Sequence, residues 1–76
     1  MDAFSAGDYV VWKWAGSFAH GTVIDIKPER TRIESKGATI VRNGNQEDPA
    51  VLITMDNGTL VLKLAHELQI SKISMD

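Results

Sequence analysis

The chain has 76 residues, of which 43% are hydrophobic and 24% charged, and it contains no cysteine. This length allows one domain with one hydrophobic core, and the composition is that of a globular protein. The lack of cysteine excludes disulfides and thiolate zinc sites, and the net charge of −2 argues against a dedicated nucleic-acid binder, whose affinity comes from neutralising phosphates.

The first ten residues contain no basic segment followed by an apolar run, so they do not resemble a signal peptide. No apolar run is long enough to span a membrane. We therefore expect a soluble, cytoplasmic monomer with no membrane partner. One domain should occupy residues 1–76, with a folded core at about residues 7–68 and short flexible tails.

The first predicted strand, residues 8–14, has the alternating pattern of a strand with one buried face. A turn at residues 15–17 leads into a second, longer strand at residues 18–27. Gly21 lies inside this strand, where we expect a bend or a bulge. Pro28 ends the strand because proline cannot donate a hydrogen bond to a neighbouring strand.

Four further strands are predicted, at residues 31–35, 38–42, 50–55 and 59–64. Lys36 and Gly37 join the first two as a two-residue hairpin loop, and a polar loop follows at residues 43–49. Asn57-Gly58 joins the last two and is the strongest hairpin signal in the chain, because both residues tolerate the positive φ of a type I′ turn.

The end of the chain has weaker signals. Residues 65–68 have the length of one 3₁₀ turn, and residues 69–74 form either a short closing strand or a loose tail. Short strands at a spacing of about ten residues, with no helix longer than one turn, predict an all-β fold. We expect a small, partly open SH3-like barrel of about five antiparallel strands, with an OB-type barrel as the alternative that the short loops disfavour.

The predicted core follows from the alternating pattern of these strands. It consists of Val10, Trp12, Val23, Ile26, Ile40, Leu60, Leu62, Leu68 and one of the neighbours Leu52 and Ile53. Which of these two neighbours faces inward depends on the register of the strand, which the pattern leaves open.

Five segments in this order resemble a known family: "GDYVVWKW" (7–14), "GTV" (21–23), "TRIESKGATIVRNG" (31–44), "DPAVLI" (48–53) and "DNGTLVLKLAHEL" (56–68). Together they are similar to the hypervirulence-associated protein TUDOR domain. The most specific parts are the "RNG…DPA" loop and the final "LK…EL". The resemblance implies a Tudor-type, SH3-like barrel, and it implies neither an enzyme nor a particular ligand.

Aromatic residues are the best lead to a binding site, and all five precede residue 19. Tudor domains that bind methylated lysine or arginine use three or four rings that face the cation. Here no Phe, Tyr or Trp follows Phe18, so we do not expect a full aromatic cage. We expect Trp12 to serve mainly in the core, and we expect Trp14 and Phe18 to lie near one end of the barrel, on either side of the first loop. The candidate ligand-binding residues are Trp14, Phe18, Trp12, His20 and Arg42.

Catalytic and metal-binding patterns have little support. The only histidines, His20 and His66, lie far apart with no motif around either of them. No nucleophile, base and orienting group occur together, and no ligand spacing is visible. We therefore predict no enzymatic activity, no cofactor and no metal. The remaining hypothesis is a small binding module, most simply for a protein or peptide.

The alternative function is binding of RNA or DNA. Basic residues concentrate between residues 27 and 42, and SH3-like barrels bind nucleic acid through basic loops with a stacking aromatic residue. Arg30 and Arg32 would then contact the nucleic acid together with Arg42. This alternative requires the three arginines to share one exposed face.

Overall fold

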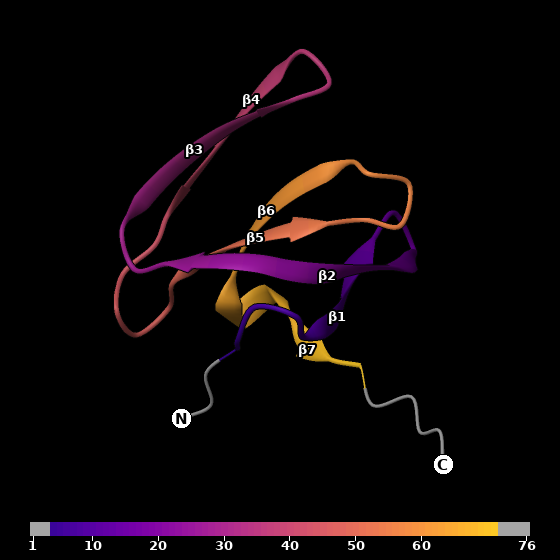
Figure 1. Cartoon of the computed structure of the whole chain (residues 1–76), viewed down its shortest axis with the longest axis horizontal. Helices are drawn as coiled ribbons and strands as arrows, with labels where there is room; N and C mark the ends of the chain where they lie inside the picture. The colour runs from indigo at the N-terminus through magenta and orange to yellow at the C-terminus, as the bar shows by residue number, and fades with distance from the viewer. Residues whose placement is uncertain (1–3, 72–76) are drawn as a thin grey trace.

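The computed structural model describes residues 4–71, which are built mainly from antiparallel strands (Figure 1). The elements in chain order are β1 (Tyr9–Trp14), β2 (Ser17–Lys27), β3 (Arg30–Ser35), β4 (Ala38–Asn43), β5 (Ala50–Thr54), β6 (Leu60–Leu64), the 3₁₀ turn η1 (Ala65–Glu67) and β7 (Gln69–Ile70). Each strand predicted before residue 65 is present, with ends that differ by no more than one residue. A short closing strand follows the 3₁₀ turn, and the predicted segment beyond residue 71 lies outside the described residues.

The strands form two sheets. Five strands pair in the order β6-β5-β2-β1-β7, and β3 and β4 pair only with each other. All pairs are antiparallel, which confirms the all-β prediction, but no closed barrel results from this pairing. The cause lies at Pro28 and Glu29, which interrupt the ladder after β2. The chain leaves the sheet there as the β3–β4 hairpin, and β5 returns to pair with β2 (Figure 1).

Two of the three hairpin loops have two central residues with positive φ. Ala15 and Gly16 have φ values of 50° and 78°, and Lys36 and Gly37 have φ values of 52° and 78°. These values are typical of type I′ turns, whose twist matches that of the flanking strands. Both loops therefore have the type I′ geometry that we predicted for the loop at Asn57-Gly58.

The prediction of a type I′ turn at Asn57-Gly58 is wrong. Only Gly58 has a positive φ, of 89°, and its N–H donates to the carbonyl of Met55 at 2.8 Å. Asn57 instead uses its side chain, whose Oδ1 accepts a hydrogen bond from the N–H of Thr59 at 3.0 Å. The strands end at residues 54 and 60, so the loop is longer than two residues.

Gly21 is required for close packing and not for a bulge. The irregularity in β2 falls later, between Val23 and Asp25. A Cβ at Gly21 would lie 2.5 Å from Cγ2 of Ile53 and 2.9 Å from the carbonyl oxygen of Thr54. The absence of a side chain therefore lets β2 approach β5 at the centre of the sheet.

The buried side chains agree largely with the predicted core. Ile53 is the inward member of its pair, because the register places it opposite Val23. The buried hydrophobic residues are Val10, Trp12, Val23, Ala50, Val51, Ile53, Leu62 and Leu68. Ile26, Ile40 and Leu60 are only half-buried. Ala50 and Val51, which the prediction missed, are adjacent residues that are both buried, so β5 is covered on both faces.

Candidate functional site

The β1–β2 hairpin separates the exposed aromatic side chains. Trp14 lies opposite Ser17 and Lys13 lies opposite Phe18. Since residues directly opposite each other point to the same face, Phe18 lies on the face opposite Trp14. Both rings are exposed, with 64% of Trp14 and 59% of Phe18 accessible. Trp14 and Phe18 thus lie on either side of the first loop, but they point to opposite faces of the hairpin and do not form one aromatic patch.

His20 belongs to the outer face with Phe18. It lies opposite Val11, and its ring stacks on Tyr9 with 5.8 Å between the ring centroids. Trp12 points to the inner face and is only 4% exposed, as predicted for a core residue. Of the three aromatic candidates, Trp12 and Trp14 share a face and Phe18 does not.

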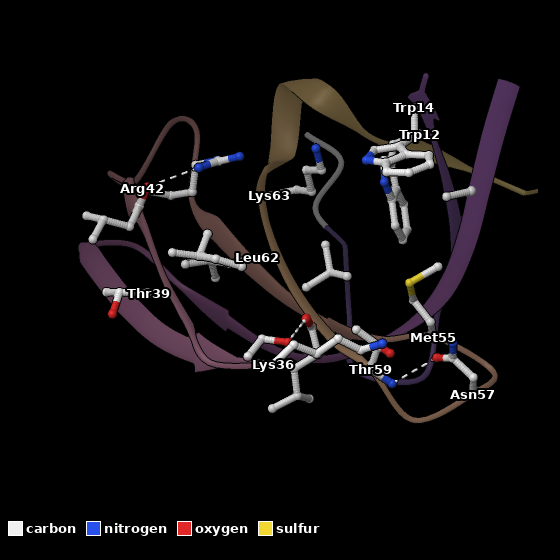
Figure 2. Close-up of a pocket in the computed structure, with 16 residues that line it drawn as sticks. Trp12, Trp14, Lys36, Thr39, Arg42, Met55, Asn57, Thr59, Leu62 and Lys63 are labelled. Carbon is white, nitrogen blue, oxygen red and sulfur yellow. Dashed lines mark hydrogen bonds between the residues drawn. The ribbon is translucent and has the colours of Figure 1, made fainter. Parts of the chain in front are cut away.

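A groove of about 630 Å³ opens next to these two tryptophans (Figure 2). Its walls come from the β1–β2 hairpin, the β3–β4 hairpin and the β5–β6 hairpin. The β3–β4 hairpin lies against β6, and the Ser35 hydroxyl donates to the carbonyl of Leu60 at 2.9 Å. The larger apolar side chains that line the groove are Trp12, Trp14, Ile40, Val41, Met55, Leu60, Val61 and Leu62. The groove thus combines an exposed indole with an apolar lining.

The charged residues that line this groove are all basic: Lys36, Arg42 and Lys63. Arg42 lies 3.6 Å from Glu67, measured from Nε to Oε1, and the same carboxylate oxygen accepts the N–H of Leu64 at 2.7 Å. Within residues 4–71, neither Lys36 nor Lys63 forms an ion pair. The groove is therefore locally positive in a chain whose net charge is −2.

The arginines of the nucleic-acid alternative do not share a face. Arg32 lies opposite Val41 in the hairpin, whereas Arg42 lies opposite Thr31. Arg30 and Arg32 are two residues apart in β3, so they point to one face and Arg42 points to the other. The geometric condition that this alternative required is not met. Arg42 alone of the three lines the groove.

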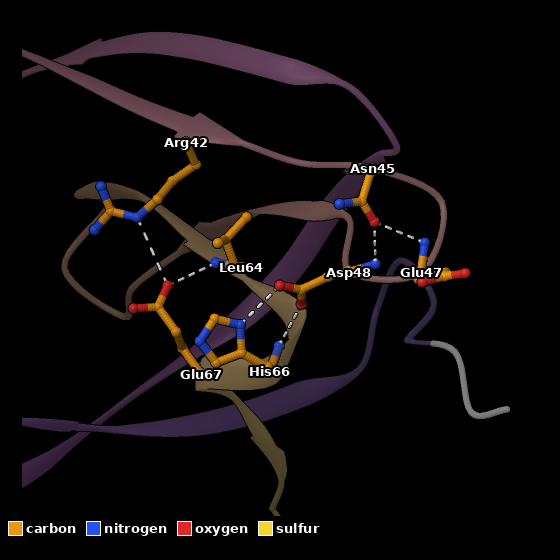
Figure 3. Close-up of polar contacts among 7 residues, drawn as sticks. All are labelled: Arg42, Asn45, Glu47, Asp48, Leu64, His66 and Glu67. Atoms are coloured by element: carbon orange, nitrogen blue, oxygen red, sulfur yellow. Dashed lines mark hydrogen bonds and ion pairs between the residues drawn. The ribbon is translucent and has the colours of Figure 1, made fainter.

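A polar cluster of Asn45, Asp48 and His66 joins the β4–β5 loop to η1 (Figure 3). Asp48 accepts two hydrogen bonds from His66, one from the backbone N–H at 2.9 Å and one at its other oxygen from the ring Nδ1 at 2.7 Å. The side-chain hydrogen bond from His66 lowers the pKa of Asp48 below its ordinary value of 3.8. Asn45 Oδ1 accepts the N–H groups of Glu47 and Asp48 within the loop.

The two most specific motifs of the family resemblance lie in this loop and at this turn. The "RNG…DPA" loop contains Asp48, and it also contains Gly44, where a Cβ would lie 2.5 Å from the backbone nitrogen of Ala50. The final "LK…EL" contains Glu67, whose carboxylate accepts a hydrogen bond from the N–H of Leu64. These motif residues fix the loop and the turn. Sequence reasoning missed the contact between Asp48 and His66, because residues 18 positions apart show no spacing signal.

Residues 4–71 contain neither a metal-binding cluster nor a membrane-spanning helix. No group of three or more His, Cys, Asp or Glu side chains in this part of the chain is arranged to hold a metal ion. Among the same residues, no helix has the length and apolar character needed to cross a membrane.

The antiparallel strands, the 3₁₀ turn η1 and the groove define a small all-β domain of the Tudor type. The family model described as the hypervirulence-associated proteins TUDOR domain matches residues 7–68. The chain belongs to this family, as its sequence motifs predicted. Comparisons with curated proteins and with solved structures gave no significant match.

Proposed function

We propose that this domain is a non-enzymatic binding module that holds a protein segment or peptide in the groove beside Trp14. The observation that carries the proposal is an indole that is 64% exposed at the end of a groove of about 630 Å³ with an apolar lining. Exposed tryptophans beside apolar pockets commonly supply much of the energy of protein interfaces. The volume lies within the range of ligand-binding clefts.

The architecture supports this proposal. Two of the residues that line the groove, Trp12 and Leu62, are buried and form its base, and the β3–β4 hairpin forms one wall. We propose that the two sheets together form a partly open SH3-like barrel in which this groove is the open side. We further propose that the domain acts in the cytoplasm as a monomer, which leaves the groove free for a partner.

The proposal is tested by an amide chemical-shift titration of the isotope-labelled protein with a pool of random octapeptides. A parallel titration uses short single-stranded RNA and DNA at low salt. We expect the peptide pool to shift amides around the groove. Trp14→Ala should abolish these shifts, and Phe18→Ala should preserve them. The second variant is a matched control, because both rings are exposed to a similar degree on opposite faces of one hairpin.

Three results would contradict the proposal. The first is the absence of any response to the peptide pool. The second is a response centred on Phe18 and His20, which would place the site on the outer face. The third is a response to nucleic acid alone, which would restore the alternative function despite the separation of the arginines.

A further inference from the structure

The charges around the groove indicate what kind of peptide it accepts. Among residues 4–71, its charged lining residues are Lys36, Arg42 and Lys63, and no carboxylate of this part of the chain lines it. We propose that the ligand is an acidic peptide segment with an apolar anchor residue, and not a cationic one. This inference rests on the proposed function, because it specifies the partner of the same groove.

The positions of the basic residues fit a ligand with more than one carboxylate. Figure 2 shows Lys63 between Arg42 and the two tryptophans, and Lys36 on the opposite side of the groove. Glu67 partly neutralises Arg42. Lys36 and Lys63, which form no ion pair within residues 4–71, supply most of the attraction for an anion. Charge complementarity of this kind selects partners and repels those of like charge.

The same charges oppose the ligand that an aromatic groove in a Tudor-type domain first suggests. A methylated lysine or arginine is stabilised by several ring faces around the cation. Here two tryptophans line the groove, one of them buried, and the three neighbouring cations repel a fourth. The apolar part of the groove therefore suits an uncharged side chain, with the ligand's carboxylates reaching Lys36 and Lys63.

A peptide fits these observations better than a nucleic acid. Tight binding to a nucleic acid requires several cations along the path of the phosphates. Arg30 and Arg32 point away from the face of Arg42, and the net charge of the chain is −2. The lining includes the half-buried side chains of Met55 and Val61, which offer apolar contact.

The length of the groove sets the size of the segment. Five consecutive residues of the β5–β6 hairpin, 59–63, line it. At a rise of about 3.3 Å per residue, their span is roughly 13 Å, which matches about four residues of an extended peptide. We therefore expect one anchor residue and two or three carboxylates to suffice.

The test uses four synthetic octapeptides that share the same two leucines and one phenylalanine and differ in the remaining side chains. The remaining residues are all glutamate in the first peptide, all glutamine in the second, all lysine in the third and all dimethyl-lysine in the fourth. Affinity is measured by amide chemical-shift titration of the wild-type protein. We expect the glutamate peptide to bind at least about tenfold more tightly than the glutamine peptide, and the two cationic peptides to bind more weakly still.

Two charge-reversal variants locate the effect. Lys36→Glu combined with Lys63→Glu should reverse the ranking, so that the lysine peptide binds more tightly than the glutamate peptide. Arg30→Glu combined with Arg32→Glu changes the net charge equally on the other face of the β3–β4 hairpin, and it should preserve the wild-type ranking. Equal loss in both double variants would overturn the inference, because it would show an effect of net charge alone.

The outcomes separate this inference from the proposed function. If the glutamine, lysine or dimethyl-lysine peptide binds the wild-type groove as tightly as the glutamate peptide, and Trp14→Ala still abolishes the shifts, the groove binds peptides and the acidic preference is wrong. If none of the four peptides binds, the proposed function fails with the inference.

Discussion

Replacing each tryptophan by alanine should separate the residue that stabilises the fold from the residue that contacts the ligand. Trp12 is 4% exposed and packs in the cluster of Val10, Val23 and Ile53. Truncating a buried tryptophan removes apolar contact and leaves a cavity, at a cost of about 3–5 kcal/mol. A chain of this length has a total stability of about 4–11 kcal/mol. Trp12→Ala should therefore lose a large part of the stability of the fold.

Trp14→Ala should leave the stability of the fold almost unchanged. The side chain is 64% exposed at the end of β1, so its removal should change the free energy of unfolding by no more than about 0.5 kcal/mol. The assay is urea unfolding followed by far-ultraviolet circular dichroism, which reports mainly the loss of the backbone strands and is compared through the unfolding midpoint of each variant. Equal shifts of the unfolding midpoint in the two variants would refute the assignment of Trp12 to the core and Trp14 to the surface.

Three other predictions follow from single features. Gly21→Ala should destabilise the fold by about 1–3 kcal/mol in urea unfolding, because the new Cβ would overlap Cγ2 of Ile53. Because Asp48 has a lowered pKa in the fold, its stabilising effect is present above about pH 4 and is lost as the pH falls through its folded-state value. The Asp48→Asn variant should therefore lose less of its free energy of unfolding than the wild-type protein when the pH falls below about 4. Higher ionic strength should weaken the binding of the acidic peptide in titrations, since salt screens exposed lysines.

Each of these predictions has a control. For Gly21→Ala, combination with Ile53→Ala should cost less than the sum of the two single changes, because the latter removes the overlapping Cγ2; strict additivity would show that the overlap is not the cause. For Asp48→Asn, a loss of stability on acidification as large as that of the wild-type protein would contradict the role of the contact with His66. For ionic strength, a salt-independent affinity would contradict the electrostatic contribution.

The strands were predictable because their signals are local. Alternating apolar residues and the breaks at Gly, Asn and Pro28 placed every strand before residue 65 to within one residue. Trp12 was correctly assigned to the core because it lies in the middle of an alternating strand. The choice between Leu52 and Ile53 required the pairing of β5 with β2, which no local pattern contains.

The arrangement of the site depended on details that the sequence pattern did not provide. We treated residues 15–17 as the first loop, but the loop is the two residues Ala15 and Gly16. This difference of one residue determines the face of Phe18, because a shift of one position moves a side chain to the other face. By contrast, the two-residue loop at Lys36 and Gly37 was predicted correctly, and the register that it sets pairs Thr31 with Arg42. That register already places Arg42 on the face opposite Arg30 and Arg32.

The groove could not be predicted because three separate hairpins form it. Its lining residues come from positions between 12 and 63 in the chain. The key contact is that of the β3–β4 hairpin with β6, which depends on the departure of the chain from the sheet at Pro28. The basic character of the groove follows from this contact, because it brings Lys36 and Arg42 to the same groove as Lys63.

We propose that an acidic peptide lies in the groove against Trp14. The most direct measurement is a set of intermolecular nuclear Overhauser effects between the unlabelled glutamate octapeptide and the isotope-labelled protein. We predict contacts from the leucine and phenylalanine side chains of the peptide to the indole of Trp14 and the methyl group of Met55. Contacts to the ring of Phe18, with none to Trp14, would place the ligand on the opposite face and contradict the account.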